Sequence, residues 1–328
     1  MLNYSKVIEN SAAIKTIELD ISRSRISHAY LFVSKDKKYL KQFAETVAIK
    51  LININETEFA EKNSLRIKKR THPDVSFFGE DKAISAEVAT GIVESSSITP
   101  FEADKKIFVI ENFQKANESA QNKLLKTIEE PAKNTIYILC ATATSKILQT
   151  ILSRVKKIDL DELSKEDIKN MLIETGVKQE KAEILSSCAN GDGEFAEKLA
   201  TDDGFVDFFN NIVSCLFEIN GSRDVLKFSS MFTAKSVDQE EFINLVQILL
   251  RDIMMLLSGK EDLVVCKHIL PKLKVISSSL NLSAVQILIE TCFNEKKKLS
   301  FNVNSTAVID DFLFKLAEVK VKCRRLSV

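Results

Sequence analysis

The chain lacks tryptophan entirely and has few residues that break helices: eight glycines and four prolines among 328 residues. This scarcity excludes collagen-like and low-complexity chains and favours a helix-rich globular protein. The length corresponds to about two or three domains. Lysine plus arginine equals aspartate plus glutamate, at 46 each. Because the charge is balanced, no overall field draws the chain toward nucleic acid or an anionic membrane, and any such contact must be local.

Long apolar runs are also missing. The longest uncharged run, residues 275–289, has 15 residues, among them four serines, and is too short and too polar to span a bilayer. The first residues lack the apolar core of a signal peptide. The sequence therefore predicts a cytoplasmic protein with no membrane partner.

The six cysteines are widely spaced, at least 26 residues apart, and form no Cys-x-x-Cys pair. Metal-binding cysteines usually occur as such close pairs. We therefore expect reduced thiols in the core, with no metal site and no disulfide. The positions are 140, 188, 215, 266, 292 and 323.

Residues 1–160 alternate short apolar runs with helical patterns. This alternation is typical of strands joined by crossover helices in a parallel sheet, and continuous apolar strands are expected where helices cover both faces. The expected strands are residues 29–33, 75–78, 107–110, 136–141 and, with a weaker pattern, 157–160.

The strand pattern stops after residue 160. Ser164, followed by acidic residues, predicts a helix N-terminus, and a unit of about three helices then extends to residue 204. From residue 205 the pattern stays helical, with one apolar stripe formed by Phe242, Leu245, Val246, Leu249 and Leu250. The predicted class is α/β followed by all-α, with domains at residues 1–160, 161–204 and 205–328.

Residues 106–154 hold the most informative pattern. Asn117 predicts a helix N-cap, and Pro131 should stop that helix after Glu130. A further strand then leads to Arg154. The pattern places Arg154 at the carboxyl edge of a parallel sheet, where ligands of open α/β sheets bind.

Several segments resemble one known family, the bacterial clamp-loader subunits of the AAA+ class. The resemblance is carried by Lys-Leu-Leu-Lys-Thr-Ile-Glu-Glu-Pro at residues 123–131 and Thr-Ile-Leu-Ser-Arg at 150–154. His-Ala-Tyr-Leu-Phe at 28–32, His-Pro-Asp at 72–74 and Asn-Val-Asn at 302–304 match it too. It implies an AAA+ parallel-sheet domain, a small helical lid and a C-terminal helical collar that joins related subunits.

The segment after the first strand departs from the ATP-binding members. Such members carry Gly-x-x-x-x-Gly-Lys-Thr there, because backbone N–H groups cradle phosphate and the lysine reaches its terminal oxygens. Here Ser34, Lys37 and Tyr39 stand at glycine positions, Leu40 replaces the lysine and Lys41 replaces the magnesium-binding hydroxyl. Three side chains should fill the cradle, so we expect a solvated basic loop and no nucleotide cofactor.

The segment after the third strand also differs from that of the ATP-binding members. Active members have Asp-Glu there, a magnesium ligand and a carboxylate that activates water, whereas this chain has Glu111 and Asn112. An amide cannot act as a general base. Glu194 and Phe195 occupy the region where catalytic relatives place a sensing arginine. We therefore expect the isolated chain neither to bind nor to hydrolyse ATP.

Arg154 keeps the family pattern although the nucleotide site does not. The resemblance implies that this arginine, supported by Ser153, points away from its own site and reaches the γ-phosphate of a neighbouring subunit as an arginine finger. The plainer alternative is that Arg154 caps the preceding helix or pairs with a surface carboxylate. Val155 replaces the cysteine that usually follows.

The resemblance as a whole implies a clamp-loader subunit without its own ATP site, acting as a scaffold. Implied partners are the ATP-binding clamp-loader subunits and the delta subunit in a hetero-oligomer of five, with the sliding clamp and primed DNA reached through the assembly. One alternative is the clamp-opening, delta-type subunit, which would not be expected to keep the Ser-Arg pair. The other is an ATPase in which Lys37, Lys38 or Lys41 reaches the phosphates.

Two basic segments are interpreted conservatively. Residues 52–72 lack the four zinc-binding cysteines of many relatives, so we expect a metal-free helical insert whose Arg66, Lys68, Lys69 and Arg70 are solvated. Residues 315–328 carry five basic residues against Glu318. A frayed, solvated tail is the first interpretation, and weak attraction to phosphate the second.

Overall fold

The computed structural model describes residues 2–55, 58–80, 83–233, 238–301 and 303–326. The chain forms two compact units. The first comprises Met1–Thr175 with Gly191–Glu197, and the second comprises Gly176–Asn190 with Lys198–Val328.

The first unit is built around a parallel sheet of five strands in the order β2-β3-β4-β1-β5. Each predicted strand is confirmed to within one residue at either end. The parallel order requires crossover connections, which the helical segments between the strands supply. The strands are β1 Ala29–Val33, β2 Val75–Phe78, β3 Lys106–Ile110, β4 Thr135–Ala141 and β5 Lys156–Asp159.

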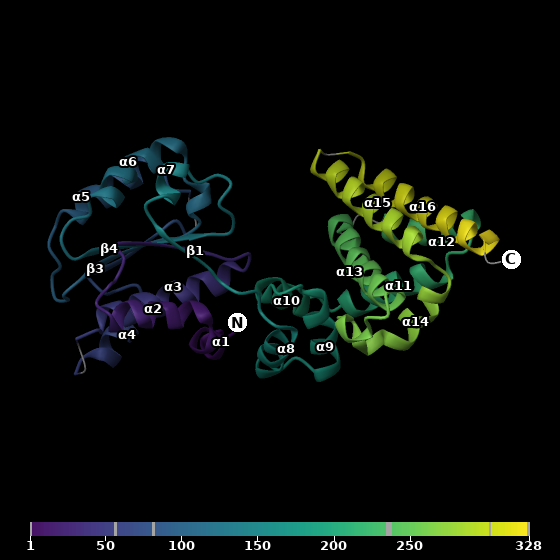
Figure 1. Ribbon diagram of the computed structural model, residues 1–328, viewed down its shortest axis with the longest axis horizontal. Helices are drawn as coiled ribbons and strands as arrows, with labels where there is room; N and C mark the ends of the chain where they lie inside the picture. The colour runs from purple at the N-terminus through teal and green to yellow at the C-terminus, as the bar shows by residue number, and fades with distance from the viewer. Residues whose placement is uncertain (1, 56–57, 81–82, 234–237, 302, 327–328) are drawn as a thin grey trace. The chain divides into compact units, whose positions relative to one another are not determined.

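Helices cover both faces of this sheet, as Figure 1 shows. Helices α2 (Ala12–Ser22) and α3 (Lys37–Ile52) lie on one face, and α5 (Ala86–Ser96), α6 (Glu118–Glu129) and α7 (Gln149–Leu152) lie on the other. Every residue of β3 and β4 is buried in consequence. The same unit also holds α1 (Ser5–Asn10), α4 (Ala60–Lys68) and the 3-10 turn η1 (Phe113–Lys115).

Both predicted N-caps are present. The Asn117 side chain accepts a hydrogen bond from the backbone N–H of Ala120 at 2.8 Å, and Ser164 Oγ accepts one from the backbone N–H of Asp167 at 3.0 Å. Such caps satisfy N–H groups that have no partner within the helix. Helix α6 ends at Glu129, one residue earlier than the sequence predicts.

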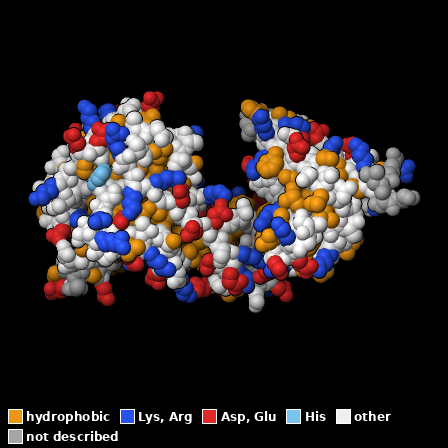
Figure 2. Space-filling model, viewed as in Figure 1, with side chains coloured by type: hydrophobic (Ala, Val, Ile, Leu, Met, Phe, Trp, Pro, Cys, Tyr) orange, Lys and Arg blue, Asp and Glu red, His pale blue; other side chains and the backbone are white. Residues whose placement is uncertain are grey.

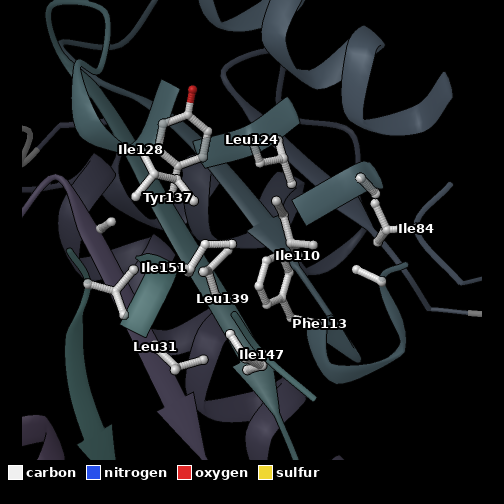
Figure 3. Packing of buried hydrophobic residues seen from close by; sticks show 14 of the residues in the cluster. Leu31, Ile84, Ile110, Phe113, Leu124, Ile128, Tyr137, Leu139, Ile147 and Ile151 are labelled. Carbon is white, nitrogen blue, oxygen red and sulfur yellow. The ribbon is translucent and has the colours of Figure 1, made fainter. Parts of the chain in front are cut away.

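The core on the α6 and α7 side of the sheet fixes the position of both helices (Figure 3). Leu124 and Ile128 of α6 pack in the same buried cluster as Tyr137 and Leu139 of β4, and Ile151 of α7 is fully buried there. Burying side chains of this size contributes roughly 1.5–3 kcal/mol each. The ends of α6 and α7 are therefore held firmly relative to the sheet.

The rest of the chain is helical, as predicted. Helix α8 belongs to the first unit and α9 to the second, so the three-domain division with boundaries after residues 160 and 204 stays a prediction. The predicted apolar stripe of α13 is fully buried. The helices are α8 Lys165–Glu174, α9 Gln179–Cys188, α10 Gly193–Ala200, α11 Phe205–Glu218, α12 Ser222–Phe232, α13 Gln239–Leu257, α14 Leu270–Ser278, α15 Leu282–Ser300 and α16 Ser305–Leu326, with 3-10 turns η2 Glu261–Leu263 and η3 Lys267–Ile269.

The interpretation of the C-terminus as a frayed tail is wrong over residues 315–326, although Lys322 and Arg324 are solvated as expected. Residues 315–326 belong to α16, where Glu318 pairs with Lys315 and Lys322 one turn away on either side. Lys320 is buried and donates to the Leu216 carbonyl oxygen at 2.5 Å. These contacts explain why the segment stays helical despite its charge. The side chain of Arg325 and all of Asn302 lie outside the described residues.

The distribution of surface charge and the burial of the cysteines agree with the expectations from the sequence. On the face in Figure 2, acidic and basic side chains are interspersed. All six cysteines are buried, and none forms a disulfide within the described ranges. Over the described ranges, no single helix is long and apolar enough to cross a bilayer, although the bent pair Lys267–Ser278 and Leu282–Leu299 meets the length and composition criteria jointly.

Candidate functional site

The carboxyl ends of β1, β3 and β4 bring the segment after the first strand and the Glu111–Asn112 segment after the third strand together. Between them lies a cavity of only about 30 Å³, against about 300–1,000 Å³ for typical ligand pockets. Lys37, Leu40 and Lys41 therefore do meet Glu111 and Asn112, but around almost no free space. The cavity is lined by Lys37, Leu40, Lys41, Glu111, Asn112, Cys140, Ala141 and Thr142.

Two side chains at phosphate-loop positions belong to the core. Tyr39 is 1% exposed and Leu40 is 4% exposed. The Tyr39 ring stacks on Tyr4, with the ring centroids 5.5 Å apart, and burial raises the pKa of Tyr39 to about 12. These residues point into packed protein, so the start of α3 has no open cradle. The expectation of a solvated loop is wrong for these two positions, because their apolar surface is buried under α3.

The N-terminus of α3 already has an anion. The buried Asp36 carboxylate accepts a hydrogen bond from the backbone N–H of Tyr39 at 2.9 Å, which makes it the N-cap of α3. It also accepts from the Tyr4 hydroxyl at 2.9 Å and from the backbone N–H of Gly193 at 2.9 Å. A helix N-terminus is where a phosphate would bind, and here a carboxylate of the chain itself lies there and joins α3 to the first turn of α10.

The lysines of the loop are largely paired. Lys41 forms an ion pair with Glu80, which lowers the pKa of that carboxyl group. Lys38 bonds Glu197 at 2.6 Å, and this hydrogen bond raises the pKa of Lys38. Lys37 is exposed, and Ser34 accepts a hydrogen bond from the backbone N–H of Asp36 at 3.3 Å. Two of the three lysines invoked by the atypical-ATPase alternative are thus held by carboxylates.

Glu111 and Asn112 are also engaged within the chain. Arg70 Nη2 donates to Glu111 Oε1 at 2.9 Å, and Asn112 Nδ2 donates to the Gly79 carbonyl oxygen at 2.9 Å. Gly79 has φ +84°, and a Cβ there would lie 2.1 Å from the Glu111 carbonyl oxygen. Glycine is required for this close approach. The carboxylate left at the magnesium-ligand position therefore already has a cationic partner.

The expectation that the basic residues of 66–70 are all solvated is wrong for the two arginines. The guanidinium of Arg70 lies 3.4 Å from the centre of the Phe77 ring, and Arg66 pairs with Glu102. Lys68 and Lys69 are exposed, as expected. Arginine stacks on aromatic rings and forms forked hydrogen bonds more readily than lysine, which explains the difference. Much of the expected insert is helical, forming α4.

Arg154 lies at the opposite edge of the sheet, and its predicted place at the carboxyl edge is wrong. It comes two residues before β5, and the first residue of that strand, Lys156, pairs with Tyr30 near the start of β1. After β4 the chain turns back through α7 to the amino edge before β5 begins. A four-residue helix gives no periodic signal in the sequence, so this return could not be read there.

Three contacts hold the Arg154 guanidinium. Nε lies 2.5 Å from Glu129 Oε1, and Nη1 donates to the Thr150 carbonyl oxygen at 2.9 Å and to Ser153 Oγ at 3.1 Å. Nη2 has no partner among the described residues, and 40% of the side chain is exposed. The pairing is what the plainer alternative predicts, yet one nitrogen and much of the side chain stay available.

Several residues that shape this region were missed by the sequence reasoning. Asp36 stands where an N-cap is preferred, directly before a helical pattern, so it could have been found. Glu129 lies within the 123–131 run, although nothing in the run indicates its partner. The partners of Glu111 and of Asp36 lie 41 and 157 residues away in the chain, so no local signal reveals them. Over the described ranges, no group of three or more histidine, cysteine or acidic residues could hold a metal ion.

Comparison with known proteins agrees with the motifs. The family described as "DNA polymerase III, delta subunit" matches residues 9–164. DNA polymerase III subunit delta' of Bacillus subtilis is 26% identical over 315 residues, which cover 93% of this chain and 95% of that protein. DNA polymerase III subunit delta' of Haemophilus influenzae is 26% identical over 56% of this chain and 55% of its own length.

The similarity to a tau subunit covers less of each chain. DNA polymerase III subunit tau of Bacillus subtilis is 26% identical over 64% of this chain and 39% of its own length. The delta' similarity spans nearly both chains, whereas the tau similarity is limited to part of each. Together these similarities support the delta-prime family of DNA polymerase III clamp-loader subunits.

Proposed function

We propose that this chain is a clamp-loader subunit that has no nucleotide site of its own and donates Arg154 to the ATP site of a neighbouring subunit. The observation that carries the proposal is the contrast between the two edges of the sheet. At the carboxyl edge, the chain's own side chains leave a cavity of about 30 Å³. At the amino edge, Arg154 is 40% exposed and its Nη2 has no partner in the described part of the chain.

The proposed chemistry of Arg154 is electrostatic. As the γ-phosphoryl group transfers to water, negative charge spreads over its oxygens, and a planar guanidinium can bond two of them at once. Arg154 would supply this charge in trans, with Ser153 supporting it. The proposed partners are the ATP-binding subunits and the delta subunit, in a hetero-oligomer of five. The assembly would place the sliding clamp on primed DNA in the cytoplasm.

The proposal is tested by the DNA- and clamp-stimulated ATPase rate of the reconstituted assembly. Arg154→Ala should lower turnover by about tenfold or more, because fingers are typically worth 10³–10⁵ in rate and the stimulated cycle of the assembly is proposed to require hydrolysis at this site. Arg23→Ala is the matched control, since Arg23 is exposed. Size-exclusion chromatography must show that all variants assemble equally. Equal rates for Arg154→Ala and wild type would contradict the finger and leave only a scaffold.

A delta-type, clamp-opening role is the alternative. It would be favoured if the isolated chain bound the sliding clamp stably while Arg154→Ala left turnover unchanged. The atypical-ATPase alternative requires that the isolated chain turn over ATP and that replacing Lys37, Lys38 or Lys41 abolish this turnover.

A further inference from the structure

Glu129 is the ion-pair partner of Arg154 and the last residue of α6. Its Oε1 lies 2.5 Å from Arg154 Nε, and the two side chains are 33% and 40% exposed. Ion pairs this exposed contribute little to folding stability. The pair therefore calls for an explanation other than stability.

The pair joins two segments that the core holds still. Ile128, next to Glu129, and Ile151, three residues before Arg154, are both fully buried in one cluster, and Figure 3 shows them on α6 and α7 against the sheet. A guanidinium held from α6 by Glu129 and from α7 by the Thr150 carbonyl oxygen has little freedom to rotate. An arginine side chain otherwise samples many rotamers.

The contacts engage two of the three nitrogens of the Arg154 guanidinium. Nε and Nη1 are occupied by Glu129, Thr150 and Ser153, whereas Nη2 is without a partner in the described part of the chain. Nη2 is thus the nitrogen left to meet an incoming oxygen. Neutralising the charge of Arg154 would not by itself require that Nη2 stay without a partner.

We propose that Glu129 is the positioning residue of Arg154: it holds the guanidinium in one orientation with Nη2 free for the γ-phosphate of the neighbouring subunit. This inference rests on the proposed finger. Preorganisation matters because a misplacement of about 1 Å can cost about a hundredfold in rate. Glu129 touches no substrate and acts only through Arg154.

The experiment measures kcat and KM for ATP in the reconstituted assembly. Glu129→Ala should lower kcat by about tenfold while KM changes by less than about threefold, because the lost contact concerns the transition state and not ATP binding. Glu129→Gln keeps the length of the side chain and an oxygen beside Nε, and should stay within about threefold of wild type. Glu130→Ala removes the neighbouring exposed carboxylate and should behave as wild type.

A double variant separates positioning from a general structural effect. In the Arg154→Ala background, Glu129→Ala should lower kcat no further, because a positioning residue has nothing left to position. A further fall would overturn the inference. So would a Glu129→Ala rate equal to that of Glu130→Ala, or above wild type, which would mean that Glu129 withholds the arginine.

The two proposals fail in different ways. If Arg154→Ala lowers kcat and Glu129→Ala does not, the finger stands and the positioning role is wrong. If Arg154→Ala leaves kcat unchanged, the proposed function itself is wrong.

Discussion

The Asp36 carboxylate shows how one residue can replace a ligand. It accepts hydrogen bonds from the backbone N–H of Tyr39 and Gly193 and from the Tyr4 hydroxyl, and it is 1% exposed. In an ATP-binding protein, the phosphates would take the N–H groups at the start of such a helix. Here the Asp36 side chain, which belongs to the chain itself, joins α3 to α10, so that no nucleotide is needed for this contact.

Asp36→Ala should therefore destabilise the fold. Removing the carboxylate leaves a buried hydroxyl and several backbone N–H groups without acceptors, at a cost of about 3 kcal/mol in the free energy of unfolding. Urea-induced unfolding, followed by circular dichroism, measures this cost. Asp203→Ala, at an exposed position, should change stability by less than about 0.5 kcal/mol. Equal midpoints for the two variants would show that the Asp36 contacts are dispensable.

Restoring the phosphate lysine alone should not restore nucleotide binding. Leu40 is 4% exposed, so Leu40→Lys places an amine in packed protein, and its desolvation should lower the melting temperature. Binding of a fluorescent ATP analogue with magnesium should stay undetectable at micromolar concentrations. Leu40→Met, which keeps the volume, controls for the substitution itself. Micromolar binding by Leu40→Lys would mean that one residue, and not the filled site, excludes ATP.

At the scale of secondary-structure elements, Lys320 of α16 meets the C-terminus of α11. Its Nζ donates to the carbonyl oxygens of Leu216 at 2.5 Å and Phe217 at 3.2 Å, which have no partners further along their helix. Burial lowers the pKa of Lys320 from 10.5 to about 8. The amine thus caps α11 but loses its proton more easily than an exposed lysine.

This shift predicts the sign of a pH dependence. Between about pH 8 and 10.5 the unfolded chain binds more protons at Lys320 than the folded chain, so this residue's contribution to stability rises with pH across that window. The difference in unfolding free energy between wild type and Lys320→Met should therefore grow more favourable to wild type from pH 8 to 10. A difference that is flat or falls over this range would contradict the buried, pKa-lowered lysine.

The elements themselves follow from the sequence far better than the contacts between them. Buried parallel strands read as apolar runs, so β1 to β5 are found within one residue, and Asn117 and Ser164 mark helix starts by their side-chain chemistry. The predicted edge for Arg154 is wrong, because the four-residue helix α7 is too short to show a helical period in the sequence. The pairing of Arg70 with Glu111 depends on residues far apart in the chain, which no local pattern reveals.

At the scale of the whole molecule, the two edges of one sheet differ in how far their polar side chains are already paired within the chain. The edge that would hold ATP is filled by the chain's own ion pairs and core side chains. The other edge presents Arg154, whose Nη2 has no partner within the described ranges. A subunit built this way would not change with its own nucleotide state. We expect it to present a constant surface to the neighbour to whose ATP site we propose that it donates Arg154.

The central claim is that Arg154 stabilises the transition state of a neighbour's reaction. It is tested most directly by trapping ADP with aluminium fluoride, an analogue of that transition state, in the reconstituted assembly. Wild type and the Arg23→Ala control should trap equally, and Arg154→Ala should trap one site fewer per assembly while binding a non-hydrolysable ATP analogue as wild type does. Equal trapping by Arg154→Ala and wild type would contradict the account.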